Sequence, residues 1–173
     1  SGLSRDRAIE AMSTAGHAQF ERPYGPPIPG FYALLAQAHM HQYGTTSEQL
    51  AAVSVACRKH ASMNPAAQMR QPITIDDVLN SKMIAHPLHL LDCSLVSDGG
   101  AAIIMTSAER AKDFKKKPVY MLGVGEGHSH EHISQAQSLT TSAAKEAGER
   151  AYAMAGLGPK DIDVAELYDC FTP

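Results

Sequence analysis

The stretch AAKEAGERAYAMAGLGPKDIDVAELYDCF, residues 143–171, decides the fold class, because it joins a helix to a strand through a glycine-rich stop. Its first half carries small residues at helical spacing, at Ala143, Ala147, Ala151 and Ala155. Such a face lets a helix lie close against a sheet or another helix, and Gly156 ends this one. The run from Asp161 to Tyr168 then predicts a strand.

Further helices and strands alternate along the rest of the chain. The apolar runs at 101–106 and 118–124 are short and follow a glycine or begin with a proline, which predicts buried strands. Residues 31–43 and 46–63 predict helices, and the second opens with a capping-box pattern. Alternating helices and buried strands indicate the layers of an α/β fold.

Length and composition exclude several classes of protein. The 173 residues suffice for one domain or slightly more, and 44% apolar with 19% charged residues is typical of a folded chain. A net charge of −3 argues against a nucleic-acid-binding surface. No apolar stretch reaches the ~18 residues of a membrane span. The three widely spaced cysteines, Cys57, Cys93 and Cys170, fit neither a disulfide framework nor a zinc knuckle, and they predict a reducing, cytoplasmic location.

A histidine-rich loop follows the strand expected at 118–124. His128, His130 and His132 alternate, so on an extended chain their imidazoles would share one face and could bind zinc. No matching cysteine or carboxylate cluster accompanies them, which favours a solvated polar loop without a metal. In a third interpretation, one of them, such as His128, faces a substrate pocket as an acid, a base or a hydrogen-bond donor.

The end of the last expected strand is a second place for chemistry, because α/β folds place functional loops at strand ends. Tyr168 could donate a hydrogen bond, Asp169 could act as a base and Cys170 as a nucleophile. The structural alternative is a strand end with a buried cysteine beside Phe171. The GVGEG sequence at 123–127 does not open an apolar helix and therefore does not predict a dinucleotide site.

Three stretches, in this order, resemble the thiolase superfamily, and most closely its lipid-transfer-protein or sterol-carrier-protein type. They are residues 43–61, 91–102 and 155–171. The resemblance covers nearly the whole chain. It implies a partial thiolase-like layered fold, as an internal fragment of a longer protein.

The resemblance also implies a division of the chain into three parts. Residues 1–96 correspond to the N-terminal half, mainly its inserted loop region, and residues 97–117 to the last strand and helix of that half. Residues 118–173 correspond to the start of the C-terminal half. The family's nucleophilic cysteine and its acid/base histidine and cysteine motifs have no counterpart here, so we expect this chain alone to be inactive.

Two site residues match family positions directly. Ser94, four residues before the Asp98–Gly99 turn, matches a serine that contacts the pantetheine arm of coenzyme A; alternatively its hydroxyl bonds its own backbone. Tyr168 stands where the family has the Asn or His of an oxyanion hole, in a YDCF sequence that resembles thiolase-like aldolases of steroid side-chain degradation. Together with Asp169 and His128, it makes up the expected catalytic set.

The implied activity is C–C bond formation or cleavage on an acyl-CoA, as in an acetyl-CoA acetyltransferase of lipid or steroid side-chain metabolism. The alternatives are a retro-aldolase acting on a β-hydroxyacyl-CoA, a non-catalytic CoA-binding or assembly subunit, and an unrelated histidine-loop metal protein. The resemblance implies coenzyme A as part of the substrate, no metal, a homodimer and an OB-fold/zinc-ribbon partner protein. The net charge and the lack of a long apolar stretch, given above, predict no nucleic-acid partner and no membrane span.

Overall fold

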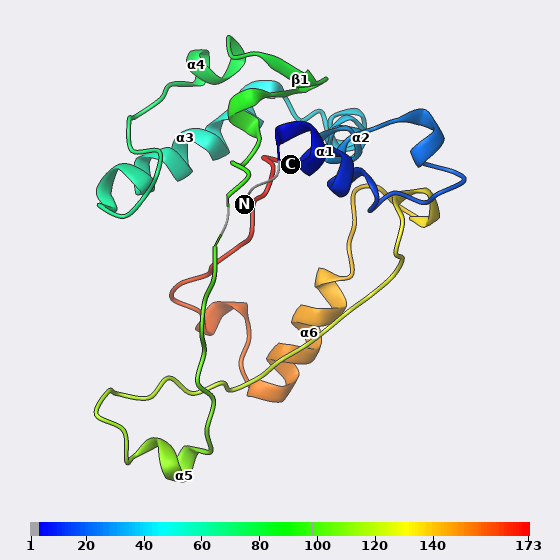
Figure 1. Ribbon diagram of the computed structural model, residues 1–173. Coiled ribbons are helices and arrows are strands. Elements are labelled where there is room, and N and C mark those ends of the chain that lie inside the picture. The colour runs from blue at the N-terminus through cyan, green and yellow to red at the C-terminus, as the bar shows by residue number, and fades with distance from the viewer. Residues whose placement is uncertain (1–3, 98) are drawn as a thin grey trace. The chain divides into compact units, whose positions relative to one another are not determined.

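The computed structural model describes residues 4–97 and 99–173 (Figure 1). By its internal contacts the chain forms two compact units. Unit 1 comprises the described residues up to Leu95 together with His130–Thr141 and Leu167–Pro173. Unit 2 comprises the described residues of Val96–Ser129 together with Ser142–Glu166. Asp98, part of the turn expected before the apolar run at 101–106, lies outside the described residues.

Two long helices dominate unit 1. The helices α2 (Ile28–Tyr43) and α3 (Ser47–Met63) confirm the two helices expected from the sequence. Helix α2 begins before Phe31, inside the proline-rich segment, because Pro29 occupies the first turn, where a missing amide costs no hydrogen bond. At the start of α3, Thr46 and Gln49 exchange hydrogen bonds in the expected capping box.

Shorter elements complete unit 1. They are α1 (Arg5–Ser13), α4 (Ile75–Leu79), the antiparallel strands β1 (Met83–Ala85) and β2 (Leu88–His89), and 3-10 turns at Arg22–Tyr24, Leu90–Asp92 and Ile133–Gln135. The β-hairpin was not expected, because strands of two or three residues are too short to show a hydrophobic period.

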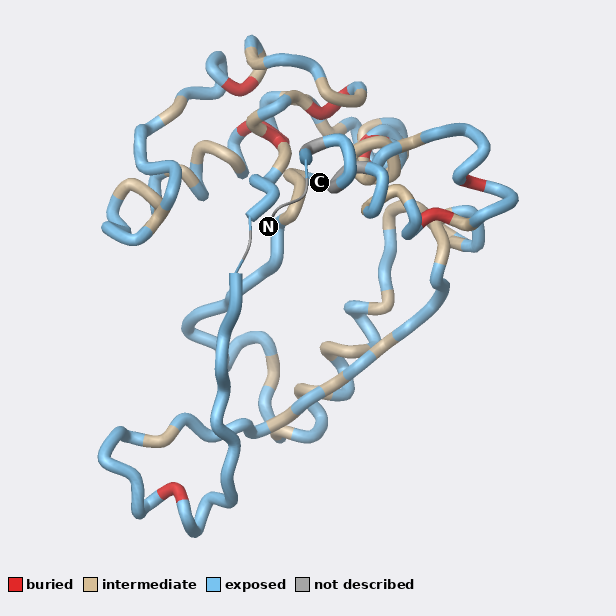
Figure 2. Tube along the Cα trace, viewed as in Figure 1, coloured by how far each residue is buried: buried red, intermediate tan, exposed pale blue. Residues whose placement is uncertain are grey.

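The core of unit 1 lies where α2, α3 and the hairpin meet. Its buried residues are Ala33, Ala36, Leu50 and Leu88. Figure 2 shows that the buried positions concentrate in the helices and turns of this unit. Phe171 packs against the same cluster, together with Tyr32 and Cys93. The C-terminal segment is therefore anchored in the core by an aromatic side chain.

Unit 2 contains α5 (Ala108–Ala111), α6 (Ala144–Ala155) and a 3-10 turn at Pro159–Asp161. Helix α6 confirms the expected helix, and its small-residue face lies against the extended segment 123–127. The glycines of that segment let the two backbones approach closely, which accounts for the GVGEG sequence without a nucleotide.

The strands expected at 101–106, 118–124 and 161–168 are wrong for this chain. The structure places Asp161 in the 3-10 turn, and the other residues lie in irregular segments outside any ladder. Their apolar side chains are exposed, with Val119 at 98% and Ile104 at 85%. A strand forms when a neighbouring strand satisfies its amides and carbonyls, and no described segment does so here. Among the described residues, no helix is long and apolar enough to cross a membrane.

Candidate active site

The C-terminal segment of unit 1 lies antiparallel beside residues 92–94. Cys93 and Phe171 form an isolated β-bridge, and the Ser94 amide donates to the Cys170 carbonyl at 3.0 Å. On the other side of the bridge, the Thr172 amide donates to a backbone carbonyl of the partner segment at 3.2 Å. The pairing brings the Ser94 region and the YDCF sequence together although they are far apart in the chain.

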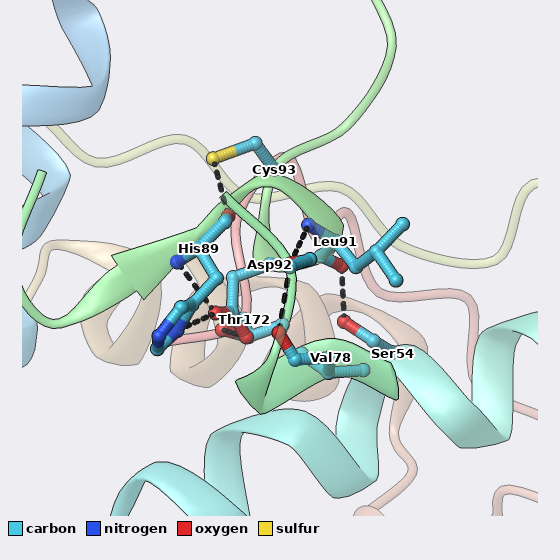
Figure 3. A network of polar contacts seen from close by, with 8 residues as sticks. Ser54, Val78, His89, Leu91, Asp92, Cys93 and Thr172 are labelled. Atoms are coloured by element: carbon cyan, nitrogen blue, oxygen red, sulfur yellow. Dashed lines mark hydrogen bonds and ion pairs between the residues drawn. The ribbon is translucent and has the colours of Figure 1, made fainter. Parts of the chain in front are cut away.

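Asp92 is the polar anchor of this pairing (Figure 3). Its carboxylate is buried and accepts the His89 amide at 2.8 Å and the Thr172 hydroxyl at 3.1 Å. The Nδ1 atom of His89 lies 3.3 Å from the same carboxylate. Nearby, the Ser54 hydroxyl of α3 donates to the Leu91 carbonyl at 2.6 Å, which ties this turn to the helix. A buried carboxylate is tolerated here because several donors satisfy it.

Tyr32 of α2 covers the other side of the C-terminal segment. Its ring stacks on Phe171 with the centroids 4.2 Å apart and the planes at 27°. A hydrogen bond with Cys170, together with burial and the neighbouring Cys170 and Tyr168, raises the pKa of Tyr32 to about 12. The phenol of Tyr32 therefore stays protonated and acts as a hydrogen-bonding group.

A further side-chain contact joins the YDCF sequence to α3. The thiol of Cys57 donates to Oδ2 of Asp169, with 2.9 Å between sulfur and oxygen. That hydrogen bond, with some burial and the negative charge of Asp169, raises the pKa of Cys57 to about 11. Burial and the charge of Asp92 raise the pKa of Cys93 to about 11 as well. Both thiols therefore stay protonated at neutral pH, and a protonated thiol is a poor nucleophile.

Of the four residues expected from the sequence, three lie in this part of unit 1. Tyr168 is 92% exposed, and Asp169 and Ser94 are also exposed. The phenol of Tyr168 is therefore accessible to a ligand, and it is not a buried tyrosine with a structural role. The backbone hydrogen bond between Ser94 and Cys170 places the expected CoA-contacting residue beside the sequence that carries Tyr168.

The fourth residue, His128, belongs to unit 2. Its Nε2 lies 2.7 Å from Oε1 of Glu126, and both side chains are exposed. His132 belongs to unit 1, where its half-buried ring lies 3.9 Å from the carboxylate of Glu21. The alternating histidines are thus divided between the two units. In the part of the chain that the structure describes, no group of three His, Cys, Asp or Glu side chains is arranged to hold a metal ion.

Tyr32, Cys57 and Asp92 are site residues that sequence reasoning did not single out. Cys57 is notable in the sequence only as one of three widely spaced cysteines, and the structure brings it to Asp169 across 112 residues of chain. No local pattern signals such a contact. Asp92 stands two residues before Ser94 within a stretch that carried the thiolase resemblance, and that position was the one available signal.

This arrangement can be compared with known proteins. Residues 125–173 match the family described as thiolase C-terminal domain-like. An acetyl-CoA acetyltransferase from Methanothermobacter thermautotrophicus is 41% identical over 163 residues, which are 94% of this chain and 43% of that protein. The chain belongs to the thiolase superfamily. The resemblance inferred from the sequence is confirmed.

Two further relatives indicate how the thiolase fold is used in similar proteins. A steroid side-chain-cleaving aldolase from Thermomonospora curvata is 42% identical over 158 residues, 87% of this chain and 40% of the aldolase. A solved structure named Ltp2-ChsH2(DUF35) aldolase superposes with a TM-score of 0.83 at 37% identity, over 99% of this chain and 46% of that one. The fit confirms a partial thiolase-like α/β fold. The chain spans less than half the length of the thiolase relatives that it matches.

Proposed function

We propose that the whole protein acts on an acyl-CoA, making or breaking a C–C bond at the site that contains Tyr168. The observation that carries the proposal is the backbone pairing of Ser94 with Cys170, which joins the exposed Ser94 to the segment that carries the exposed Tyr168 and Asp169. Coenzyme A enters as part of the substrate, and the Ser94 hydroxyl would contact its pantetheine arm. The acetyltransferase and aldolase relatives support this substrate class.

Tyr168 specifically supports a retro-aldol reaction as a second candidate beside thiolysis. In that reaction a base takes the β-hydroxyl proton of a β-hydroxyacyl-CoA, the Cα–Cβ bond breaks, and its electron pair forms an enolate on the thioester. The β-carbon leaves as a ketone or aldehyde, and the enolate takes a proton at Cα. No nucleophilic cysteine is needed. The Tyr168 phenol would donate to the oxygen on which charge develops, and Asp169 would be the base.

The two reactions are distinguished by their substrates. The whole protein is assayed in parallel on a β-ketoacyl-CoA with free CoA and on a β-hydroxyacyl-CoA without CoA. Cleavage of the first alone identifies thiolysis, and cleavage of the second alone identifies the aldolase. A protein that binds CoA and cleaves neither is the non-catalytic subunit. His128 stays a proposed acid or base, and His128→Gln is assayed on whichever substrate reacts.

The role of Tyr168 is tested by Tyr168→Phe, which removes only the hydroxyl. Loss of one preorganised donor to a developing oxyanion typically lowers kcat by ~10²–10³. Because Tyr168 is almost fully exposed, the melting temperature should change little. Tyr24, which is 84% exposed in the same unit, provides the matched control Tyr24→Phe, expected to keep full activity. Normal turnover in Tyr168→Phe would remove the phenol from the mechanism.

We also propose that the whole protein is a cytoplasmic homodimer that assembles with an OB-fold/zinc-ribbon partner. Support for the partner comes from the structural neighbour, whose name joins Ltp2 to ChsH2(DUF35). The dimer and the location rest on the thiolase resemblance and on the cysteine usage. Sedimentation equilibrium of the whole protein tests the dimer. Copurification from its own cells, followed by mass spectrometry, tests for a partner of that class.

A further inference from the structure

The contact between Cys57 and Asp169 joins the middle of a long helix to the expected catalytic sequence. Helix α3 is a regular element of 17 residues, tied by Ser54 to the Leu91 carbonyl. Cys57 lies one turn after Ser54 on this rigid support. Its thiol reaches Asp169 at 2.9 Å, within unit 1.

The backbone pairing with residues 92–94 does not by itself fix the Asp169 side chain. That pairing engages the Cys170 carbonyl, the bridge at Phe171 and the Thr172 amide, all of which follow Asp169 in the chain. Tyr168 before it is almost fully exposed. The orientation of the Asp169 carboxylate therefore depends on a contact made by its own side chain.

Other roles for Cys57 fit the structure poorly. The residue is exposed and its thiol is free, so it is neither a core residue nor half of a disulfide. Its raised pKa, about 11, keeps the proton on sulfur at neutral pH, which makes the thiol a lasting hydrogen-bond donor and a poor nucleophile. A protonated donor on one carboxylate oxygen limits rotation of the Asp169 side chain.

We propose that Cys57 is a positioning residue, whose thiol orients the Asp169 carboxylate for its role as a base. The inference rests on the proposed function for the reaction itself. The contact can be tested separately from the reaction. Nothing in the local sequence of α3 indicates the role, because the partner lies 112 residues away.

The catalytic part is tested with Cys57→Ala and Cys57→Ser in the whole protein, using whichever acyl-CoA the wild type cleaves. Cys57→Ala should lower kcat by about tenfold, the value of one charge-assisted hydrogen bond, with KM nearly unchanged. Cys57→Ser keeps a donor and should retain activity within about threefold. Met63→Ala, on an exposed position of the same helix, is the control and should match the wild type. Equal kcat for the Ala variant and the wild type would overturn the proposal.

The contact is tested without activity by the pH dependence of Cys57 alkylation, followed by peptide mass mapping. Wild-type Cys57 should react as a thiol of pKa about 11, and Asp169→Asn should shift it toward 9.0. At pH 8 the alkylation rate of Cys57 should then rise by more than about tenfold, because the thiolate fraction sets the rate. An unchanged profile in Asp169→Asn would overturn the contact, even in an active enzyme. A wild type inactive on both substrates would instead overturn the proposed function, and with it the catalytic role of Cys57.

Discussion

Gly125 lies against the backbone carbonyl of Ala147 so closely that a β-carbon at position 125 would overlap its oxygen. Gly123 and Gly127 meet Ala151 and Ala143 in the same way. Every second residue of the extended segment thus matches every fourth residue from Ala143, which caps α6, into that helix. Two residues of extended chain and four of helix both advance about 6–7 Å, so the match repeats along the contact.

A methyl group added to this contact should destabilise unit 2. Gly125→Ala forces the extended segment away from α6, and overpacking of this kind costs ~1–3 kcal/mol of unfolding free energy. Gly148→Ala is the matched control. Gly148 lies on α6 as well, and a β-carbon added there would meet no atom within 4 Å. That control should stabilise α6 by ~0.5–1 kcal/mol. Urea unfolding followed by circular dichroism measures both, and effects of equal sign would contradict the packing described.

Removal of the Asp92 carboxylate should release the C-terminal segment. Asp92→Ala leaves the His89 amide and the Thr172 hydroxyl without their acceptor, and we expect a loss of ~2–4 kcal/mol in unfolding free energy. Thr172→Val removes only one of these hydrogen bonds and should cost ~1 kcal/mol. Hydrogen exchange at the Ser94 amide, which pairs with Cys170, reports the release directly. Unchanged protection of that amide in Asp92→Ala would show that Phe171 holds the segment alone.

Glu21 should make unit 1 sensitive to acid. Burial disfavours its charge, but the amides of Ser134 and His17, each 2.7 Å from the carboxylate, and the nearby His132 hold its pKa below 4.5. A carboxyl whose pKa is lower in the folded state stabilises the fold above its unfolded pKa, and this stability is lost as pH falls through the folded pKa. Unfolding free energy should therefore decline below about pH 4.5. In Glu21→Gln the unfolding free energy should decline less steeply over the same pH range. An equally steep decline would mean that other groups cause the acid sensitivity.

The 173-residue chain by itself should associate. Ile104, Val119 and Leu122 of unit 2 are 85%, 98% and 60% exposed on extended segments that carry unpaired backbone groups. Exposed apolar area and open strand edges both favour association. Sedimentation velocity should show oligomers whose fraction grows with concentration, and Ile104→Glu should reduce them. A monodisperse monomer with a cooperative melt would argue strongly against this expectation.

Loss of the Ser94 hydroxyl should weaken the binding of coenzyme A. One neutral hydrogen bond is worth ~1 kcal/mol, so Ser94→Ala should raise the Kd about fivefold. Ser62→Ala, an exposed hydroxyl at the end of α3, is the control and should bind normally. Isothermal titration of the whole protein with CoA measures both, and an unchanged Kd for Ser94→Ala would remove that residue from the site.

Local patterns in the sequence were sufficient for the helices and for the superfamily. The capping box at Thr46 and the alanine face of α6 each act within a few residues, so composition and spacing reveal them. The extended segments at 101–106 and 118–124 were misjudged as strands, because strand formation depends on partners elsewhere and not on the segment alone. The Cys57–Asp169 contact was missed for the same reason, since it arises only once the chain has folded.

The bridge between Cys93 and Phe171 has a consequence for the order of folding. The Thr172 hydroxyl that binds Asp92 is 80 residues further along the chain, so this contact closes a long loop through unit 2. Loop-closure entropy must be overcome before such a contact is formed, whereas the capping box and turns of α3 need only local contacts. The helices should therefore form first and the candidate site last. The same entropy grows slowly with length, by about 0.6 kcal/mol per doubling, so insertions at exposed turns of unit 2 should leave the closure of the site almost unaffected.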